Sequence, residues 1–206
     1  ALVRAVGVLG CEITIVAWGN PYNGTKPIDA YSKYVTRWLL CSKEENEFIC
    51  LLKEKCADPS QKIVLIPDCD FSVTMIDRHL DELKPFFLMP HIHHQQGAIV
   101  EWSDKTRQKE LAANLGMNIA KYRTIEIKNG RYNIPEDIHY PCFPKALASV
   151  AGGKAGMWRC DKKEDLVRSL QDIIQREKVD AKVMLEDYME IEKEDAVLGV
   201  SDGQNV

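Results

Sequence analysis

Helix-like and strand-like apolar patterns alternate along residues 1–98, and this alternation constrains the fold more than any other feature of the sequence. A helical pattern ends at Gly10, and the strand-like run CEITIVAW follows it. The later segments KEENEFICLLKEKCAD, QKIVLIPDCD and VTMIDRHLDELKPFF have the patterns of a helix, a buried strand and a helix. The alternation predicts a doubly wound α/β domain whose ligands lie near the carboxyl ends of parallel strands, close to Asp68 and Asp70.

Residues 99–206 follow a different pattern, in which hairpins and helices are mixed. A helix is expected over SDKTRQKELAANLG, with Ser103 or Asp104 as its N-cap. The segment KYRTIEIKNGRYNIP predicts a hairpin that turns at Asn129 and Gly130. The next segments have the patterns of strand, loop, strand, helix and strand: CFPKALAS, VAGGK, AGMWRC, DKKEDLVRSLQDIIQREK and AKVMLEDYM. These residues therefore predict a second domain of the α+β class.

Composition limits the class of protein. A chain of 206 residues is long enough to bury a core in one or two domains, and its net charge of −4 argues against nucleic acid or an anionic membrane as partner. No apolar run approaches the roughly 20 residues of a membrane span. Seven cysteines without a CxxC pair are typical of reduced thiols. We therefore expect a globular, cytoplasmic protein.

The stretch FPKALASVAGGKAGM places a glycine pair between two lysines. Gly152 and Gly153 let the backbone approach a ligand and turn its N–H groups toward phosphate oxygens. Lys145 and Lys154 would add positive charge on either side. The pattern thus indicates a phosphate-binding loop, with a surface hairpin that binds nothing as the alternative.

Two familiar phosphate loops are excluded by the order of residues. A Walker A loop needs a glycine where Ala148 stands and a serine or threonine where Ala155 stands. A protein-kinase layout puts the glycines before the strand lysine, whereas Lys145 precedes them here and no HRD or DFG motif follows. A dinucleotide-binding Rossmann protein stays a third possibility: it would need a GxGxxG loop, and the start that could have held one is expected to be missing. The acidic stretch after the last strand and the glycine pair at residues 152–153 argue against it.

The stretch KVMLEDYMEIEKEDAVLGV joins an apolar strand to an acidic segment that runs to Glu194. A strand edge can offer backbone N–H and C=O groups to an adenine, and a carboxylate a few residues later can accept hydrogen bonds from ribose hydroxyls. The alternative is a solvated acidic loop. In combination with the glycine loop, the stretch indicates a nucleotide site.

Taken in order, these segments resemble the ATP-grasp superfamily, most closely its carboxylate-amine ligases of the D-aspartate ligase and carbamoyl-phosphate synthetase type. The segment SDKTRQKELAANLGMNIAKY is similar to that family's opening helix, FPKALAS to its lysine-bearing strand, AGGKAGM to its glycine-rich loop and MLEDYM to its adenine hinge. Residues 1–98, with SKYV and VLIPDCD, resemble the preceding domain of these ligases.

The resemblance implies an α/β fold of two domains. Residues 1–98 would form a pre-ATP-grasp, Rossmann-like domain with a parallel sheet and its first strand missing, so that the protein is expected to begin earlier. Residues 99–206 would form the α+β N-terminal lobe of the ATP-grasp fold, with the hinge and the start of a truncated C-terminal lobe.

The resemblance also implies which residues bind ATP. The expected contacts are Lys105, Lys145, Gly152, Gly153 and Lys154 with the phosphates, Glu186, Asp187, Tyr188 and Met189 with the adenine, and Glu194 with the ribose. Either Glu186 or Asp187 would contact the adenine, and Tyr188 and Met189 would do so through their backbones.

In this family ATP phosphorylates a carboxylate, an amine attacks the acyl phosphate, and Mg²⁺ together with lysines offsets the phosphate charge. The expected function is therefore an ATP-dependent ligase that forms a C–N bond between a small carboxylate and an amine, with ATP and Mg²⁺ as cofactors; a homodimer is left open. The catalytic residues and magnesium ligands are expected in the missing C-terminal part, so none is assigned here and the fragment alone is expected to be inactive. The alternative is a non-catalytic nucleotide-binding or interaction module.

The cluster HIHH invites a metal-site interpretation, because imidazole is a common zinc ligand. His91 and His93 could share a strand face, but no nearby cysteine completes a tetrahedral set. A polar loop between the two domains explains the cluster more simply, and we predict no metal site there.

Overall fold

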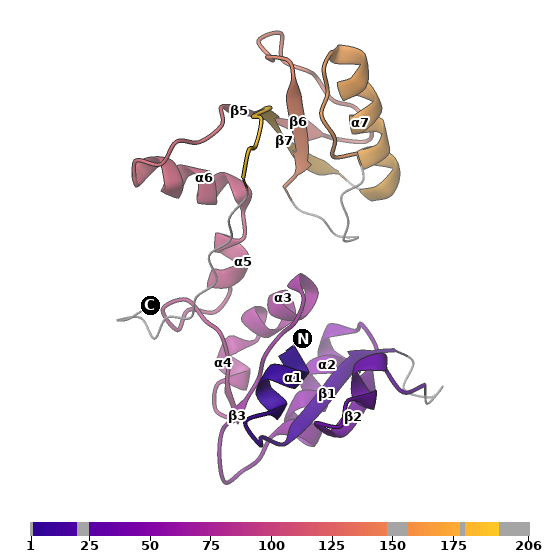
Figure 1. Ribbon diagram of the computed structural model, residues 1–206, viewed down its shortest axis with the longest axis vertical. Helices are drawn as coiled ribbons and strands as arrows, with labels where there is room; N and C mark the ends of the chain where they lie inside the picture. Colours follow the sequence, from indigo (N-terminus) through magenta and orange to yellow (C-terminus); the bar gives the residue numbers. More distant parts are fainter. Residues whose placement is uncertain (1, 20–24, 148–155, 178–179, 194–206) are drawn as a thin grey trace. The chain divides into compact units, whose positions relative to one another are not determined.

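The computed structural model describes residues 2–19, 25–147, 156–177 and 180–193 (Figure 1). The chain divides into two compact units, unit 1 (Ala1–Glu101) and unit 2 (Trp102–Val206). Within the described ranges, no helix combines the length and the apolar character that a membrane span requires.

Unit 1 alternates helices with short strands, as the sequence predicts. Its elements are α1 (Leu2–Gly7), β1 (Ile13–Trp18), the 3-10 helix η1 (Ile28–Tyr31), β2 (Val35–Cys41), α2 (Glu45–Leu51), the π-helix η2 (Leu52–Cys56), β3 (Ile63–Val64), α3 (Asp70–Arg78), α4 (Leu80–Leu83), β4 (Phe87–Leu88) and α5 (Ala98–Trp102), whose last residue belongs to unit 2.

The strands of unit 1 pair in parallel, which confirms the α/β class. β1 pairs with β2 from Ile13 opposite Val35 to Trp18 opposite Cys41, and β3 pairs with β4. In the described part of the unit these are two separate two-stranded sheets. Both β2 and β4 lie outside the strands that the sequence predicts.

The single helix predicted over VTMIDRHLDELKPFF is wrong. The chain leaves helical geometry at His79, with φ −114° and ψ 21°, and forms α3 and α4 on either side of it. Pro85, which has no backbone N–H to continue the helix, follows Lys84 directly after the end of α4. Phe87 then joins the strand β4 and is buried.

The core of unit 1 lies where α2, α3 and α4 cover the strands. Its buried members are Cys41, Phe48, Ile49, Leu52, Met75, Ile76, Leu83 and Phe87. Phe48 and Ile49 come from α2 and Met75 and Ile76 from α3, so these apolar helix faces meet over β2 and β4.

The described part of unit 2 consists of two helices and an antiparallel sheet. Its elements are α6 (Lys105–Asn114), β5 (Tyr122–Ile127), β6 (Cys142–Ala146), α7 (Lys163–Glu177) and β7 (Ala181–Asp187). The strand order is β5-β7-β6, so β7, which follows the other two in sequence, lies between them (Figure 1). The unit is of the α+β class, as the sequence predicts.

Two predicted hairpins of unit 2 differ from the structure. Asn129 and Gly130 do form the predicted turn, with φ values of 51° and 70° and mutual hydrogen bonds between Lys128 and Arg131. No strand follows it, because β5 pairs with β7 instead. Of the predicted strand AGMWRC, the described residues 156–160 form one antiparallel bridge, between Cys142 and Cys160.

The register of the sheet gives it two different faces. On one face, the side chains of Ile125, Val183 and Leu185 pack against Leu166 and Leu170 of α7 and form the core of the unit. On the other face lie Tyr122, Glu186 and Phe143, which are lateral neighbours on the three strands. This second face is the one that α6 approaches (Figure 1).

Candidate functional site

The helix α6 directs two lysines toward the sheet. Asp104 caps the helix by accepting hydrogen bonds from the backbone N–H groups of Thr106 and Arg107, at 2.7 and 3.1 Å. Lys105 and Lys109 follow one turn apart and therefore lie on the same side of the helix. The cap fixes the first turn, from which both side chains extend.

Lys105 reaches the end of β6. Its Nζ donates a hydrogen bond to the backbone carbonyl of Ala146 at 2.8 Å. Ala146 directly follows Lys145, so the ammonium group of Lys105 lies beside the strand residue that the sequence predicts as a phosphate ligand.

Glu186 of β7 binds two further lysines, one with each carboxylate oxygen. Lys109 Nζ lies 2.6 Å from Oε1, and Lys145 Nζ lies 2.5 Å from Oε2. The Glu186 side chain is only 8% exposed. We refer to Lys105, Lys109, Lys145 and Glu186 as the Glu186 cluster.

The protonation of Glu186 follows from these contacts. Burial raises the pKa of its carboxyl group, but hydrogen bonds and charge attraction from Lys109 and Lys145 outweigh burial and lower the pKa below its ordinary value. Glu186 is therefore an ionised carboxylate at neutral pH. A buried carboxylate is tolerated only with such partners, because an unpaired one would be strongly destabilising.

The Glu186 cluster carries an excess of positive charge. It contains three ammonium groups and one carboxylate. Two aromatic rings border it: the Lys109 ammonium lies 5.6 Å from the centre of the Tyr122 ring, and that of Lys145 lies 5.8 Å from the Phe143 ring. Such a site favours an anionic ligand that can approach the lysines and lie against an aromatic surface.

The residues after Glu186 are those that the sequence predicts as an adenine hinge. Asp187 N–H donates to the carbonyl of Lys121, and Tyr188 N–H donates to the carbonyl of Pro141, both at 2.9 Å. Among the described residues, Met189 has no hydrogen-bond partner, and its side chain is exposed. The backbone N–H groups of Asp187 and Tyr188 are thus engaged within the protein.

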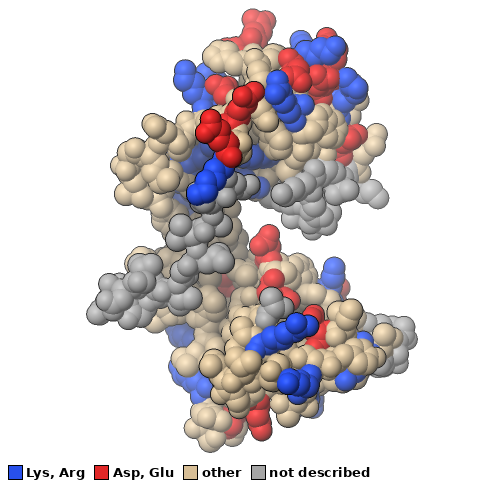
Figure 2. Space-filling view, viewed as in Figure 1, with Lys and Arg blue, Asp and Glu red and all other residues tan. Residues whose placement is uncertain are grey.

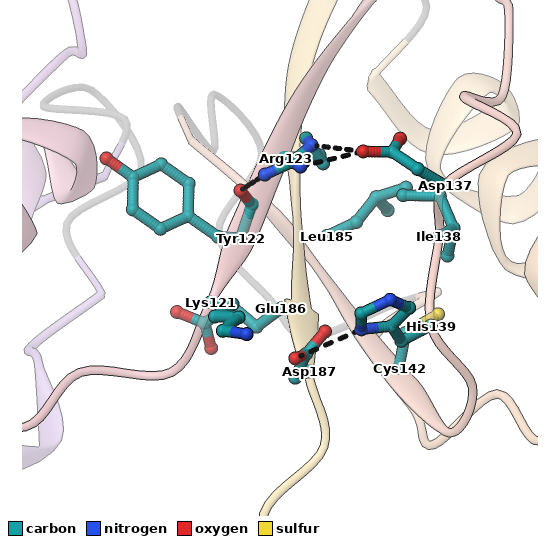
Figure 3. Close-up of a pocket in the computed structure, with 10 residues that line it drawn as sticks. All are labelled: Lys121, Tyr122, Arg123, Asp137, Ile138, His139, Cys142, Leu185, Glu186 and Asp187. Carbon is teal, nitrogen blue, oxygen red and sulfur yellow. Dashed lines mark hydrogen bonds and ion pairs between the residues drawn. The ribbon is translucent and has the colours of Figure 1, made fainter.

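A small cavity lies on the other side of the same strands (Figure 3). Figure 3 shows Arg123 paired with Asp137, at 2.7 Å, and His139 facing Asp187, at 3.7 Å, with Tyr122 pointing away from them. The cavity measures about 30 Å³, which is space for one or two water molecules and not for a nucleotide.

The face of unit 2 seen in Figure 2 mixes positive and negative side chains. The Glu186 cluster differs from these mixed surface charges in the close contact of its groups and in the burial of its carboxylate. Single exposed pairs such as Lys128 with Glu126 contribute little binding specificity.

In unit 1 the predicted ligand-facing residues Asp68 and Asp70 are exposed, and Asp70 begins α3. The rings of His91 and His94 stack with their centres 3.9 Å apart. Across the described residues, no three His, Cys, Asp or Glu side chains are grouped as metal ligands.

The structure brings together three of the residues singled out from the sequence, Lys105, Lys145 and Glu186. Asp187, Tyr188 and Met189 follow directly at the end of β7. The other four, Gly152, Gly153, Lys154 and Glu194, lie outside the described residues. Sequence reasoning missed Lys109, although its position four residues after Lys105 in a predicted helix places both on one side.

No protein-family model matches the chain, and no curated protein sequence matches it. Among solved structures, the chain is similar to D-alanine-D-alanine ligase from Helicobacter pylori, with 13% sequence identity and a TM-score of 0.49. The similarity covers 87% of this chain and 64% of that one, so the chain spans less than two thirds of the ligase. The α/β class rests on the strand pairing described above and not on this similarity.

Proposed function

We propose that this chain supplies the phosphate-binding side of an ATP site in a carboxylate-amine ligase of the ATP-grasp type. The observation that carries the proposal is the Glu186 cluster, in which Lys105, Lys109 and Lys145 converge at the ends of β6 and β7. The order of the opening helix, lysine strand and acidic hinge along the chain, which resembles that family, supports the same conclusion.

The charges of the cluster fit a nucleotide triphosphate. Lysine ammonium groups bind phosphate oxygens as point charges, and three of them against one carboxylate leave a positive excess for the ligand. The Met189 backbone, which has no partner among the described residues, is available to the adenine at the hinge. Lys154, Gly152 and Gly153 as phosphate contacts, and Glu194 as ribose contact, stay predictions.

In the proposed reaction, ATP supplies the phosphoryl group that activates a carboxylate for attack by an amine. The residues of this chain bind and orient the triphosphate: Lys105 and Lys145 hold phosphate oxygens, and Glu186 keeps Lys145 at the end of β6. The described residues group no ligands for Mg²⁺, so no residue here is assigned to the metal.

Binding of a non-hydrolysable ATP analogue, measured by calorimetry, tests the proposal. We expect Lys145→Ala to weaken binding by about tenfold or more, the loss expected for one charge-assisted hydrogen bond. Lys182→Ala is the matched control, because Lys182 also lies on the sheet but is exposed and pairs with Glu126. Equal affinity of Lys145→Ala and the unchanged chain would refute the site.

A non-catalytic nucleotide-binding module is the second candidate. It is favoured by the same cluster, because binding of an anion by its lysines requires no reaction to follow. The two functions are separated by phosphate release from ATP, measured on a longer protein that contains this chain, in the presence of amino acids and other small carboxylates and amines. Release only with both an acid and an amine identifies the ligase.

A further inference from the structure

Glu186 has two lysine partners, and they differ in their surroundings. Lys109 extends from the first turns of a capped helix, and its side chain is 19% exposed. Lys145 lies on the outer strand β6, and its side chain is 38% exposed. The two cations are therefore unequal: Lys145 is the more accessible to a ligand, and Lys109 is the more enclosed.

A phosphate ligand must compete with Glu186 for Lys145. If Lys145 turned toward phosphate oxygens and Glu186 had no other partner, a buried carboxylate would be left without compensation. That cost would oppose binding. Lys109 removes the difficulty, because it holds the other carboxylate oxygen at 2.6 Å and does not depend on Lys145.

We propose that Lys109 is a positioning residue that keeps Glu186 charged and in place, so that Lys145 can transfer its hydrogen bond from Glu186 to a phosphate oxygen of the ligand. The inference rests on the proposed function, because it concerns the same nucleotide site. No covalent step is involved: one hydrogen bond of the Lys145 ammonium group is exchanged for another, and no proton leaves Lys109, Lys145 or Glu186.

Among the described residues, the charged and titratable groups beside Glu186 come from three elements. Lys109 approaches from α6, Lys145 from β6, and Tyr122 is its neighbour on β5. The Lys105 ammonium is engaged with the Ala146 carbonyl. Within the described part of the chain, removal of Lys109 therefore leaves Lys145 as the only cation in contact with the Glu186 carboxylate.

The first part of the test is the variant Lys109→Met, which keeps the length of the side chain and removes its charge. We expect its affinity for a non-hydrolysable ATP analogue to fall by about tenfold, as for loss of a charge-assisted hydrogen bond. Lys109→Arg restores the cation and should restore affinity.

The second part is a double-mutant cycle with Glu186→Gln. In the Glu186→Gln background Lys145 is free of the carboxylate, so Lys109→Met should change the affinity less than twofold. A full tenfold loss in that background would show that Lys109 contacts the phosphates directly, and it would overturn the inference. Equal affinity of Lys109→Met and wild type would overturn it as well.

A third measurement separates this inference from the proposed function. The pKa of Glu186, followed by NMR of its side-chain carboxyl carbon without nucleotide, should rise in Lys109→Met and return in Lys109→Arg. An unchanged pKa in Lys109→Met overturns the inference even where the nucleotide binds. If the pKa change is present but the wild-type chain does not bind the analogue, the proposed function is overturned. The transfer of the Lys145 hydrogen bond to a phosphate oxygen is then overturned with it.

Discussion

The Nζ of Lys105 donates a hydrogen bond to the carbonyl of Ala146 at 2.8 Å, and this contact joins the start of α6 to the end of β6 across 41 residues of sequence. It directs a cation to the residue next to Lys145. We therefore expect Lys105→Ala to affect both stability and ligand binding.

For stability, Lys105→Ala should lower the free energy of unfolding by about 1 kcal/mol, the typical net contribution of one hydrogen bond. For binding, the affinity for an ATP analogue should fall by about tenfold. Urea denaturation and calorimetry measure the two effects. The control Lys182→Ala removes an exposed lysine of β7 and should change neither the stability nor the affinity by a comparable amount. An equal loss in that control would contradict a specific role for Lys105.

The N-cap of α6 provides a second prediction. Asp104→Ala removes the acceptor for the N–H groups of Thr106 and Arg107 and should cost about 1 kcal/mol of stability. Asp104→Ser retains a capping oxygen and should recover most of the loss. Urea titrations followed by circular dichroism would compare the two variants. If both lose the same stability, the cap has no role in holding the helix.

A third prediction concerns acid stability. The pKa of Glu186 is lower in the folded protein than the ordinary value of 4.5, so its ionised form stabilises the fold above about that pH. This contribution is lost as the pH falls through the lowered folded-state value. Urea denaturation between pH 3 and pH 7 should show a smaller loss of stability on acidification in Glu186→Gln than in wild type. Identical pH dependence would contradict the ionised pair.

The reactivity of the cysteine thiols should follow their burial. Cys11, Cys50 and Cys69 are exposed, whereas Cys41, Cys142 and Cys160 are buried. Burial, with the neighbouring Cys160, raises the pKa of Cys142 to about 12, so it forms almost no thiolate at pH 8.

Iodoacetamide at pH 8 should therefore alkylate the three exposed thiols first, as measured by intact mass and peptide mapping. Among them Cys50 should react more slowly, because a hydrogen bond to Glu54 raises the pKa of its thiol. All seven cysteines should react in 8 M urea, which serves as the control. Early labelling of Cys142 would contradict its burial.

The packing of α7 gives a fifth prediction. Leu170 is fully buried against the sheet, so Leu170→Ala should lower the free energy of unfolding by roughly 2–5 kcal/mol through lost burial and a residual cavity. Leu115→Ala removes an exposed side chain of the same size and should change stability by less than about 0.5 kcal/mol. Similar losses in the two variants would contradict the position of Leu170 in the core.

Local patterns predicted the long elements well. The helix α7 has clear helical periodicity, α6 was predicted from its capping residues, with Asp104 as one of two proposed N-caps, and β7 was predicted from its apolar run. The two-residue strands β3 and β4 are too short to have a period, so sequence alone could not place Phe87 in a strand. The turn at Asn129 and Gly130 was predicted correctly, but the strand expected to follow it and pair with β5 was not. Instead β5 pairs with β7, which is distant in sequence, and local patterns do not reveal such pairing.

The candidate site was predictable only in part. Lys145 and Glu186 could be proposed from their segments, but their contact could not, because it depends on the antiparallel register that places Phe143 opposite Glu186 and Lys145 on the same face. Burial of the Glu186 carboxylate likewise arises from tertiary packing. Lys109 could have been predicted as a site residue, because it lies four residues after Lys105 in a predicted helix and therefore on the same side of that helix.

The order β5-β7-β6 also has a consequence for synthesis of the chain on the ribosome. The two outer strands emerge first, and neither can complete its pairing until residues 181–187 have followed α7 out of the exit tunnel. Until then, β5 and β6 have unsatisfied backbone groups and exposed apolar side chains, the features that chaperones recognise and that favour aggregation. The interval between translation of Ala146 and of Asp187 is therefore the period in which this half of the protein is most vulnerable, and rapid translation of that interval would protect it.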